Sequence, residues 1–302
     1  MDQLKNQDQE QQNDRKKNLI ETLSQNIVEK KELSSIDIEF VKNQLSIYFN
    51  KNPKIYQALL ELSVDKISRS KHYKQALKDS RSELRKTYGI FILDKLDFSL
   101  LDNINMNDKE IHKQILSNHA STKERIDLYE AGIYSEIFAI TDRPKSIIDL
   151  GCGLNPISII YMRLDPKKTY YFASDIGAEL CEYHKKYFDA VKINGDTKVI
   201  DLKEIEKNSQ LIMDITKREF DVCFLFKVLD SIETKGHKLA ENLIKHIPAK
   251  YVVASFATNV VKGTKMNHPY RGWIERMFER LNYEFRMIEK ENEIFYVIKL
   301  HD

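Results

Sequence analysis

The chain has 302 residues, 42% of them hydrophobic, and at about 150 residues per domain this length favours two domains over one. Its 48 Lys and Arg nearly balance 46 Asp and Glu, so the net charge of +2 leaves any asymmetry to be sought locally. No apolar run reaches the roughly 18 residues of a membrane helix, residues 1–17 lack an apolar signal segment, and Cys152, Cys181 and Cys223 form no CxxC pair. These features exclude membrane, secreted, disulfide-rich and zinc-ribbon proteins, and they predict a cytoplasmic protein without a metal site.

The first 118 residues are predicted to form a tail and a helical domain. Residues 1–17 are almost entirely polar, so we expect them to be a disordered tail. Over residues 18–118 apolar side chains recur at spacings of three and four, which is typical of amphipathic helices. Gly89 is the only glycine before Gly132, as expected for an all-helical domain with few tight turns.

Near Pro144 the pattern changes to short β-branched or aromatic runs that alternate with amphipathic segments. The predicted strands are 146–150, 170–174, 220–226, 251–256, 283–289 and 294–300, and the predicted helices between them include 155–164, 178–189 and 234–246. This alternation indicates a mainly parallel sheet covered on both faces. The last two strands are joined by a short polar turn, and a terminal antiparallel hairpin is typical of Rossmann-like methyltransferase sheets. Residues 119–302 are therefore predicted to form such an α/β domain.

The segment Ser146–Pro156 (SIIDLGCGLNP) joins a buried strand to a helix through a glycine turn. Asp149 lies at the end of the strand, and Gly151 and Gly153 let the backbone approach a ligand that a Cβ atom would block. No third glycine completes the GxGxxG pattern that receives a pyrophosphate. A ligand with a small polar tail fits better, and S-adenosylmethionine (SAM) is the candidate. The alternative is an ordinary strand-to-helix turn.

The second predicted strand ends in Asp175, 24 residues after Gly151, with Ile176 next to it. An acid at the end of this strand can accept hydrogen bonds from both ribose hydroxyls, by the geometry that serves NAD in Rossmann folds. Asp175 and Ile176 are therefore assigned to the cofactor site.

A third cofactor contact is predicted from the residues before the strand at 220–226. Asp214 and Ile215 are assigned to the adenine group of the cofactor. The segment 190–215 has several possible strand registers. For that reason Asp201 and Asp196 remain rivals of Asp214.

Lys227 follows the strand at 220–226, at the carboxyl edge where ligands bind in open α/β sheets. The alternative is a lysine that extends along apolar surface into solvent. Methyltransferases that act on exocyclic amines usually carry an (Asp/Asn)-Pro-Pro-aromatic loop at this point, and Lys227–Asp230 (KVLD) is not one.

The segment His119–Arg125 (HASTKER) contains a helix-capping box formed by Ser121 and Glu124. Such a box needs no function. His119 and Arg125 flank it, and no core pattern explains these two polar residues. They are therefore candidates for a binding site.

Residues 51–90 hold ten Lys or Arg against four Asp or Glu, a local excess of six positive charges. Several of the basic residues recur at about helical spacing, so they can share one face directed at phosphates. The candidate RNA-binding residues are Arg69, Lys71, Lys78, Arg81 and Arg85. The alternative is a solvated helix surface, which is common in a chain with 31% charged residues.

Together these motifs resemble the Arm/FmrO family of aminoglycoside-resistance 16S rRNA (guanine-N7) methyltransferases. DLGCGLNP at 149–156 resembles the SAM-binding motif of that family, and HASTKER at 119–125 resembles its HxSTxER signature. Further similarities are ASDI at 173–176, FLFK at 224–227 with Glu233 downstream, Lys265-Met266, and NEIFYVI at 292–298. The similarities run in order over residues 112–300.

The resemblance implies that residues 18–118 dock on 16S-type rRNA or the small ribosomal subunit, and that the C-terminal domain uses SAM to methylate N7 of a guanine in the decoding region. It places Arg125 near the methionine carboxylate of SAM, with His119 in the same site. It places Lys227 and Lys265 near the target base, as the catalytic-side residues. The sequence departs from the family at Phe256–Val260 (FATNV), where the family has Phe-Pro-Thr-Lys-Ser. We expect a monomer.

Guanine N7 carries a lone pair and no proton, so it can attack the sulfonium methyl group of SAM without a general base. This fits a sequence in which no His–carboxylate pair stands out. Two alternatives stay open. One is a SAM-dependent methyltransferase that acts on another RNA or atom, and the other is a non-catalytic SAM- and RNA-binding ribosome-assembly factor. Methyl transfer to small subunits separates the second from the rest.

Overall fold

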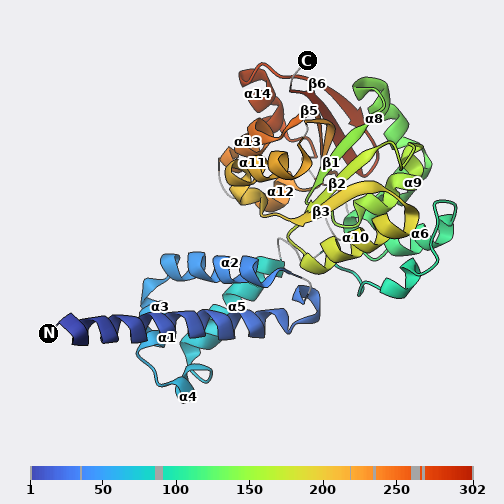
Figure 1. Ribbon diagram of the computed structural model, residues 1–302. Coiled ribbons are helices and arrows are strands. Elements are labelled where there is room, and N and C mark those ends of the chain that lie inside the picture. Colours follow the sequence, from blue (N-terminus) through green and yellow to red (C-terminus); the bar gives the residue numbers. More distant parts are fainter. Residues whose placement is uncertain are drawn as a thin grey trace. The chain divides into compact units, whose positions relative to one another are not determined.

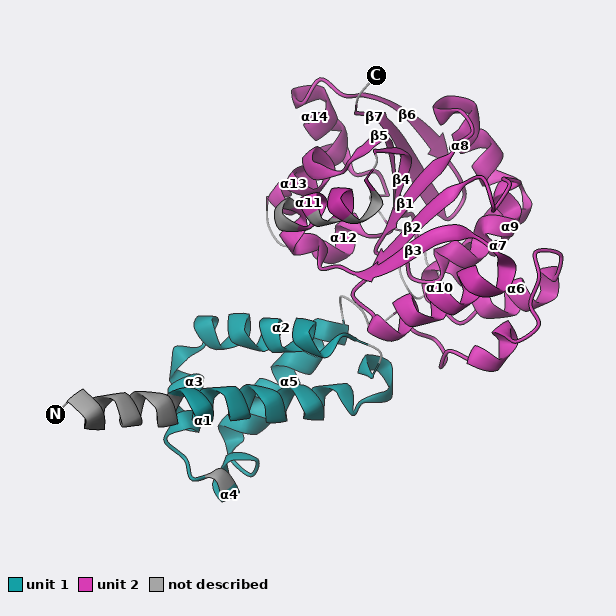
Figure 2. Ribbon diagram, in the orientation of Figure 1, with its two compact units in different colours: residues 1–90 teal, residues 91–302 magenta. Residues whose placement is uncertain are grey.

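The computed structural model describes residues 2–34, 36–85, 91–217, 219–233, 236–259, 266 and 269–300. The chain divides into two compact units, residues 1–90 and residues 91–302 (Figure 2). The division falls at residue 90, whereas the sequence predicted it at residue 118.

The first unit is built from helices. They are α1 (Asp2–Val28), the 3₁₀ helix η1 (Lys31–Leu33), α2 (Ile38–Lys51), α3 (Pro53–Leu60), α4 (Val64–Ile67) and α5 (Lys71–Leu84). Leu23, Val41 and Leu45 are fully buried between them. Asp37 and Ser70 cap α2 and α5, because their side chains accept hydrogen bonds from backbone amides of the first turn. The predicted helical N-terminal region is confirmed.

The expected disordered tail differs from the structure, in which α1 begins at Asp2. Gln, Glu, Lys and Arg, which dominate residues 2–17, have favourable helix propensities. The same helix continues into Leu19, Leu23 and Ile27, which are buried. A polar segment has little apolar surface to bury, but its residues can still extend a helix.

The basic residues predicted to bind RNA differ in their exposure and in their partners. Lys71, Lys74 and Lys78 are exposed along α5, and Arg69 is exposed in the turn before it. Their spacing of three and four places the three lysines on one side of the helix. These residues form the α5 basic face.

Arg81 and Arg85 continue the same helical spacing, but their guanidinium groups already have partners within the unit, so we do not count them in the α5 basic face. Arg81 is half-buried and donates a hydrogen bond to the backbone oxygen of Asn26. Arg85 forms an ion pair with Glu32 at 2.6 Å. Both guanidinium groups are held by acceptors inside the unit, which the helical spacing alone did not reveal.

Residues 91–118 belong to the second unit because their side chains pack into it. They include η3 (Phe98–Leu101) and α6 (Lys109–Leu116). His112 of α6 is fully buried, and its Nε2 atom lies 2.8 Å from the hydroxyl of Tyr187. The Phe98 ring meets Tyr183 edge-on at 5.1 Å between ring centroids. Because of these contacts the first unit ends at residue 90, and not at the predicted residue 118.

The second unit is centred on a seven-stranded sheet of order β3-β2-β1-β4-β5-β7-β6 (Figure 1). Its strands are β1 (Ser146–Leu150), β2 (Tyr170–Asp175), β3 (Asn194–Val199), β4 (Phe220–Phe226), β5 (Ala249–Ala257), β6 (Glu284–Glu289) and β7 (Glu293–Lys299). The first five strands are parallel, and β7 is antiparallel to both β5 and β6. The predicted Rossmann-like sheet with a terminal antiparallel hairpin is confirmed.

The sequence did not resolve β3, whose residues Asn194–Val199 read NGDTKV. As an edge strand it is half exposed along its length, so it needs no continuous apolar run. Gly195 pairs with Tyr171 of the neighbouring strand β2, and a Cβ atom on Gly195 would come within 2.2 Å of the backbone oxygen of Tyr171. Close packing, rather than strand propensity, selects the residue there.

Helices cover both faces of the sheet (Figure 1). They are α7 (Ala120–Glu130), α8 (Ile133–Thr141), α9 (Ile159–Met162), α10 (Ala178–Val191), α11 (Ile205–Thr216), α12 (Leu229–Ile232), α13 (Lys238–His246) and α14 (Gly272–Arg280), with the 3₁₀ helices η4 (Asn155–Ser158) and η5 (Leu202–Glu204). On one face, strand residues such as Leu225 and Tyr296 form a core with Leu243 of α13 and Phe278 of α14. The side chains of the site come from the other face.

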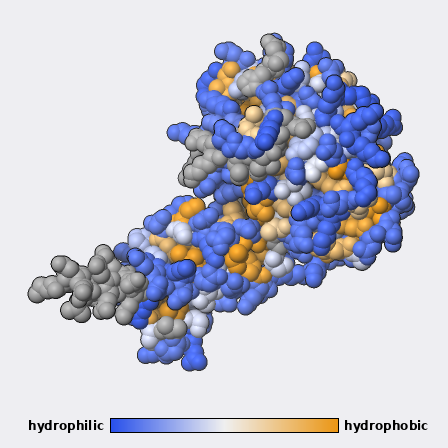
Figure 3. Space-filling view, viewed as in Figure 1, coloured by the Kyte–Doolittle hydropathy of each residue, from blue (hydrophilic) through white to orange (hydrophobic). Residues whose placement is uncertain are grey.

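The visible surface is largely hydrophilic (Figure 3). Among the described residues, no helix has both the length and the apolar character needed to cross a membrane.

Candidate active site at the carboxyl ends of the strands

The glycine turn after β1 has the backbone conformation that its sequence predicts. Gly151 and Gly153 have φ angles of 63° and 50°, in the left-handed region that favours glycine. A Cβ atom on Gly151 would lie 2.8 Å from the Val228 side chain, and one on Gly153 would lie 2.7 Å from the His119 ring. Protein side chains therefore fill the space beside these two glycines, and any larger residue would collide with them.

The backbone N–H and the carbonyl oxygen of Gly153 each have a side-chain partner. Its N–H donates to Oδ2 of Asp175 at 2.9 Å, and its carbonyl oxygen lies 2.6 Å from Nε2 of His184. The other oxygen of Asp175 accepts the N–H of Gly177 at 3.0 Å. Asp175 therefore joins the end of β2 to the glycine turn. A carboxylate offers about four lone-pair sites, so Asp175 can still accept a hydrogen bond from a ligand hydroxyl.

A buried polar network lies beneath the turn. Asp149 accepts hydrogen bonds from Asn155 at 2.8 Å and from the Tyr171 hydroxyl at 2.7 Å. Asn155 in turn accepts a hydrogen bond from the Tyr129 hydroxyl at 2.6 Å. Burial raises the pKa of Asp149 to about 7. The network fixes the end of β1 relative to the start of η4 and to α7.

Two buried histidines flank Gly153. Burial, with a smaller contribution from the Arg125 cation, lowers the pKa of His119 to about 3. Burial lowers the pKa of His184 to about 4. Both rings are therefore neutral near pH 7, and Nε2 of His184 must carry the proton that it donates to Gly153. His184 was not predicted, because a histidine on the inner face of α10 has no signal in the sequence apart from its helical position.

His184 gives a pH-dependent contribution to stability. Its pKa falls from an ordinary 6.5 to about 4 in the folded chain, so between these values the unfolded chain binds more protons. The free energy of unfolding should therefore fall with decreasing pH across this window, by up to about 1.4 kcal/mol per pH unit from this group. His184→Asn keeps a donor for Gly153 and removes the titration. Urea unfolding at several pH values should show the wild-type minus variant difference shrinking below pH 6.5, and a constant difference would contradict this account.

Several polar atoms around the turn lack a partner. Among the residues that the structure describes, Nδ1 of His119, Oδ1 of Asp149, Oγ of Ser174 and Nδ1 of His184 are buried and make no hydrogen bond. Buried polar groups are nearly always hydrogen-bonded, so this concentration is a feature of a ligand site. Nδ1 of His184 and Oδ1 of Asp149 can accept hydrogen bonds, and the Ser174 hydroxyl can donate or accept one. They fit a ligand that brings N–H and O–H donors, as the amino and ribose groups of SAM do.

Arg125 is fully buried and belongs to a second cluster. Its guanidinium group donates to Glu293 through Nε at 3.0 Å and Nη2 at 2.7 Å, and also to Tyr129 and Ser121. Of its five N–H groups, one on Nη1 remains, so a two-pronged grip on the methionine carboxylate is not available in this arrangement. The predicted position of Arg125 near the methionine carboxylate stays a prediction, and within the protein Arg125 joins α7 to the start of β7.

Glu293 is a site residue that was not predicted. It is fully buried at the first position of β7, next to the carboxyl end of β5, and it also accepts a hydrogen bond from Ser255 at 2.5 Å. Burial alone would raise its pKa, but the Arg125 and Lys227 cations hold the pKa below its usual value. In the sequence Glu293 appeared only as the acid at the start of an apolar strand run, within the family-like segment 292–298.

Lys227 lies at the carboxyl end of β4, as predicted. Its side chain is 8% exposed, with Nζ 2.6 Å from Glu124 and 3.4 Å from Glu293. The alternative of a lysine extending into solvent is therefore wrong. Lys265, the other predicted residue on the catalytic side, lies outside the described residues.

The assignment of Asp214 to adenine is wrong. Asp214 lies near the end of α11, is exposed, and accepts a hydrogen bond from Gln210. Because α11 runs back toward the start of β4, its end lies at the edge of the sheet opposite to the carboxyl ends. Ile215 is in the same turn of α11, and its side chain lies outside the described part of the chain.

Of the two rivals, Asp201 occupies the appropriate edge. It follows β3 and caps η5 through the N–H of Lys203 at 2.9 Å, and burial raises its pKa. Asp196 is exposed within β3 and accepts a hydrogen bond from Tyr170. Ile176 is half-buried beyond β2, on the same edge as Asp201.

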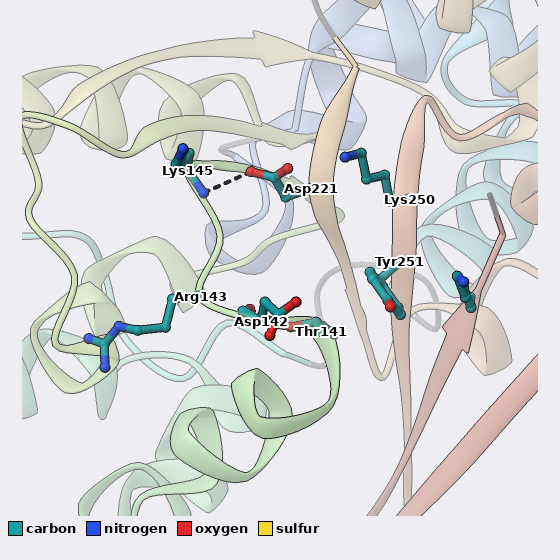
Figure 4. A pocket seen from close by; sticks show the side chains of 8 residues that line it. Thr141, Asp142, Arg143, Lys145, Asp221, Lys250 and Tyr251 are labelled. Carbon is teal, nitrogen blue, oxygen red and sulfur yellow. Dashed lines mark hydrogen bonds between the residues drawn. The ribbon is translucent and has the colours of Figure 1, made fainter. Parts of the chain in front are cut away.

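A prominent hollow lies elsewhere, at the amino-terminal edge of the sheet (Figure 4). It measures about 350 Å³ and is lined by Thr141, Asp142, Arg143, Lys145, Asp221, Lys250, Tyr251 and Lys299. Asp221 accepts the backbone N–H of Lys145 at 2.7 Å and so ties β4 to the start of β1. This hollow is far from the glycine turn along β1, so we do not assign the cofactor to it.

The strand order, the antiparallel β7, the glycine turn after β1 and the buried acid ending β2 define the class of Rossmann-like methyltransferases. Within this class, residues 70–297 match the family model described as "Ribosomal RNA methyltransferase (FmrO)". The match covers most of the chain, and the chain therefore belongs to this family of ribosomal RNA methyltransferases.

Two similar curated proteins are both named 16S rRNA (guanine-N7) methyltransferases. The chain is 27% identical over 236 residues to a "16S rRNA (guanine(1405)-N(7))-methyltransferase" of Micromonospora echinospora, covering 74% of this chain and 82% of that protein. It is 29% identical over 188 residues to one of Micromonospora rosea, covering 62% and 65%. A solved structure, the 16S rRNA methyltransferase RmtF in complex with S-adenosyl-L-homocysteine, superposes with a TM-score of 0.65 at 22% identity, covering 93% and 98% of the two chains. The predicted family and enzyme class are confirmed.

Proposed function

We propose that this chain transfers the methyl group of SAM to N7 of a guanine in the decoding region of 16S-type rRNA. The membership of residues 70–297 in the ribosomal RNA methyltransferase family carries this proposal. Two relatives named for guanine N7 support the target atom. The solved neighbour with S-adenosyl-L-homocysteine, which is SAM without its methyl group, supports the donor.

When bound, SAM supplies an electrophilic methyl group, and the residues of the chain hold the reactants. In this proposal Asp175 accepts the ribose hydroxyls, and its hydrogen bond to Gly153 at the end of β2 supports this role. In this proposal Asp201 contacts the adenine group, a role supported by its position after β3. The unpartnered polar atoms near Gly153 support a ligand in this region. Catalysis then depends on alignment of the two reactants.

Guanine N7 needs no residue to remove a proton, because its lone pair is free to attack. The residues at the carboxyl end of β4 are consistent with this, since Lys227 is held in ion pairs with two carboxylates. The charge that moves onto the base is tolerated by surrounding dipoles.

The product tests this function. Small ribosomal subunits and naked 16S rRNA should be treated with the purified chain and labelled SAM, then with borohydride and aniline, which cleave RNA at 7-methylguanine. We expect cleavage at one guanine of the decoding region and aminoglycoside resistance on expression in a sensitive host. Label on an exocyclic amine or a ribose would favour a methyltransferase of another specificity. No label would favour a non-catalytic SAM- and RNA-binding factor.

We further propose that the α5 basic face docks on rRNA. Lys71→Glu with Lys78→Glu should weaken subunit binding and reduce the dependence of log affinity on log salt by about 0.7–0.9 for each phosphate that the protein no longer neutralises. Lys185→Glu, at an exposed position of α10, applies the same kind of charge reversal to the second unit as a control. Equal effects of the two changes would mean that the α5 basic face is only solvated. The monomeric state, the cytoplasmic location and the lack of a metal stay predictions.

A further inference from the structure

Four charged side chains meet at the carboxyl ends of β4 and β5, and we call them the edge cluster: Arg125, Lys227, Glu293 and Glu124. Arg125 pairs with Glu293 at 2.7 Å, and Lys227 lies 3.4 Å from Glu293 and 2.6 Å from Glu124. Two cations face two anions, so the edge cluster is electrically balanced.

The two carboxylates are held very differently. Glu293 is fully buried and is fixed by Arg125 and Ser255. The Glu124 side chain is 49% exposed, and it meets Lys227 at the surface. Exposed ion pairs contribute little and exchange readily with other ions, whereas a buried carboxylate between cations does not leave. Glu293 is therefore the permanent partner of Lys227, and Glu124 is its exchangeable one.

The backbone of Lys227 is held in a strained conformation at this point. Its φ angle is 59°, a left-handed conformation that glycine adopts at much lower cost. The strain is maintained by the N–H of Lys227, which donates to the backbone oxygen and to Oγ of Ser255, both at 3.1 Å. Strained residues of this kind are concentrated at functional sites.

Two groups of an RNA substrate could replace Glu124 beside Lys227: the edge of the target guanine or a backbone phosphate. An ammonium group against the N7 and O6 edge of guanine would compete for the lone pair that must attack, and would oppose the positive charge that forms on the base. A phosphate of the RNA backbone instead brings one negative charge to Lys227. It would leave the edge cluster balanced after Glu124 is displaced.

We propose that Glu124 stands in for an RNA phosphate on Lys227 in the free protein, and that the phosphate next to the target nucleotide displaces it on binding. Glu293 keeps the ammonium group in place throughout the exchange. This inference rests on the proposed function, since it requires an RNA substrate.

A double-mutant cycle tests the exchange. The full-length chain, Glu124→Gln, Lys227→Gln and the double variant should be compared for binding to unmethylated small ribosomal subunits at several salt concentrations. Glu124→Gln should tighten binding about 1.5- to 5-fold, the range expected when a surface ion pair no longer competes. Lys227→Gln should weaken binding and lower the salt slope by about 0.7–0.9. The double variant should behave as Lys227→Gln.

Glu130→Gln is the matched control, because Glu130 lies on the same helix, is 48% exposed and also pairs with a lysine. If it tightens binding as much as Glu124→Gln, or if the gain persists without Lys227, the exchange is refuted and only overall charge matters. Melting temperatures verify that each variant folds. Failure of the wild-type chain to methylate RNA would overturn the proposed function itself. Methylation without coupling between Glu124 and Lys227 would overturn this inference alone.

Discussion

Replacing Asp175 by alanine is expected to weaken the binding of SAM by about 10²- to 10⁴-fold. The change removes a carboxylate aimed at two ribose hydroxyls, and hydrogen bonds to a charged acceptor contribute about 1.5–3 kcal/mol each. It also releases the N–H of Gly153, which Asp175 holds at 2.9 Å, so the glycine turn loses one of its two clamps. Isothermal titration calorimetry with SAM measures the effect.

Two other acids serve as comparisons for this experiment. Asp201→Ala should also weaken SAM binding, because Asp201 lies at the carboxyl end of β3. Asp214→Ala should leave it unchanged, because Asp214 is exposed at the opposite edge of the sheet. A folded Asp175→Ala protein with wild-type affinity, or loss of affinity in Asp214→Ala, would refute this arrangement of the site.

Arg125→Met should lower the free energy of unfolding by about 3–5 kcal/mol, the usual cost of removing one partner of a buried ion pair. Glu293 would stay fully buried without its main cation, and the Phe226 ring would lose the guanidinium group 4.7 Å from its centre. Urea unfolding measures the change. The double variant Arg125→Met with Glu293→Leu should recover part of the stability, because it leaves no uncompensated carboxylate.

The stability of the double variant decides between two origins of the effect. Recovery identifies the buried charge as the cause. A double variant less stable than Arg125→Met would show that packing around Glu293 matters more than its charge.

Much of the second unit followed from local sequence. Ser146–Leu150 and Phe220–Phe226 were predicted as strands with the bounds that the structure shows, because strands buried on both faces must be continuous apolar runs. Gly151 and Gly153 were predictable because a tight strand-to-helix turn needs positive φ angles. Asp175 followed from the rule that ligands bind beyond the carboxyl ends of parallel strands.

The structure decided the residues whose roles depend on distant partners. Arg125 and Glu293 are 168 positions apart and form one buried pair, so neither local pattern nor spacing could connect them. Arg81 and Asn26 are 55 positions apart, and this hydrogen bond alone removed Arg81 from the α5 basic face.

The sequence by itself therefore determined the class of fold, the glycine turn and the acid that ends β2, because backbone geometry and burial act on neighbouring residues. Only the tertiary structure decided that Asp214 lies at the wrong edge, that His184 holds Gly153, and that Lys227 is shared between two carboxylates. Hydrogen bonds and ion pairs form between groups that folding brings within about 3 Å. Such proximity depends on the path of the whole chain, which no short segment specifies.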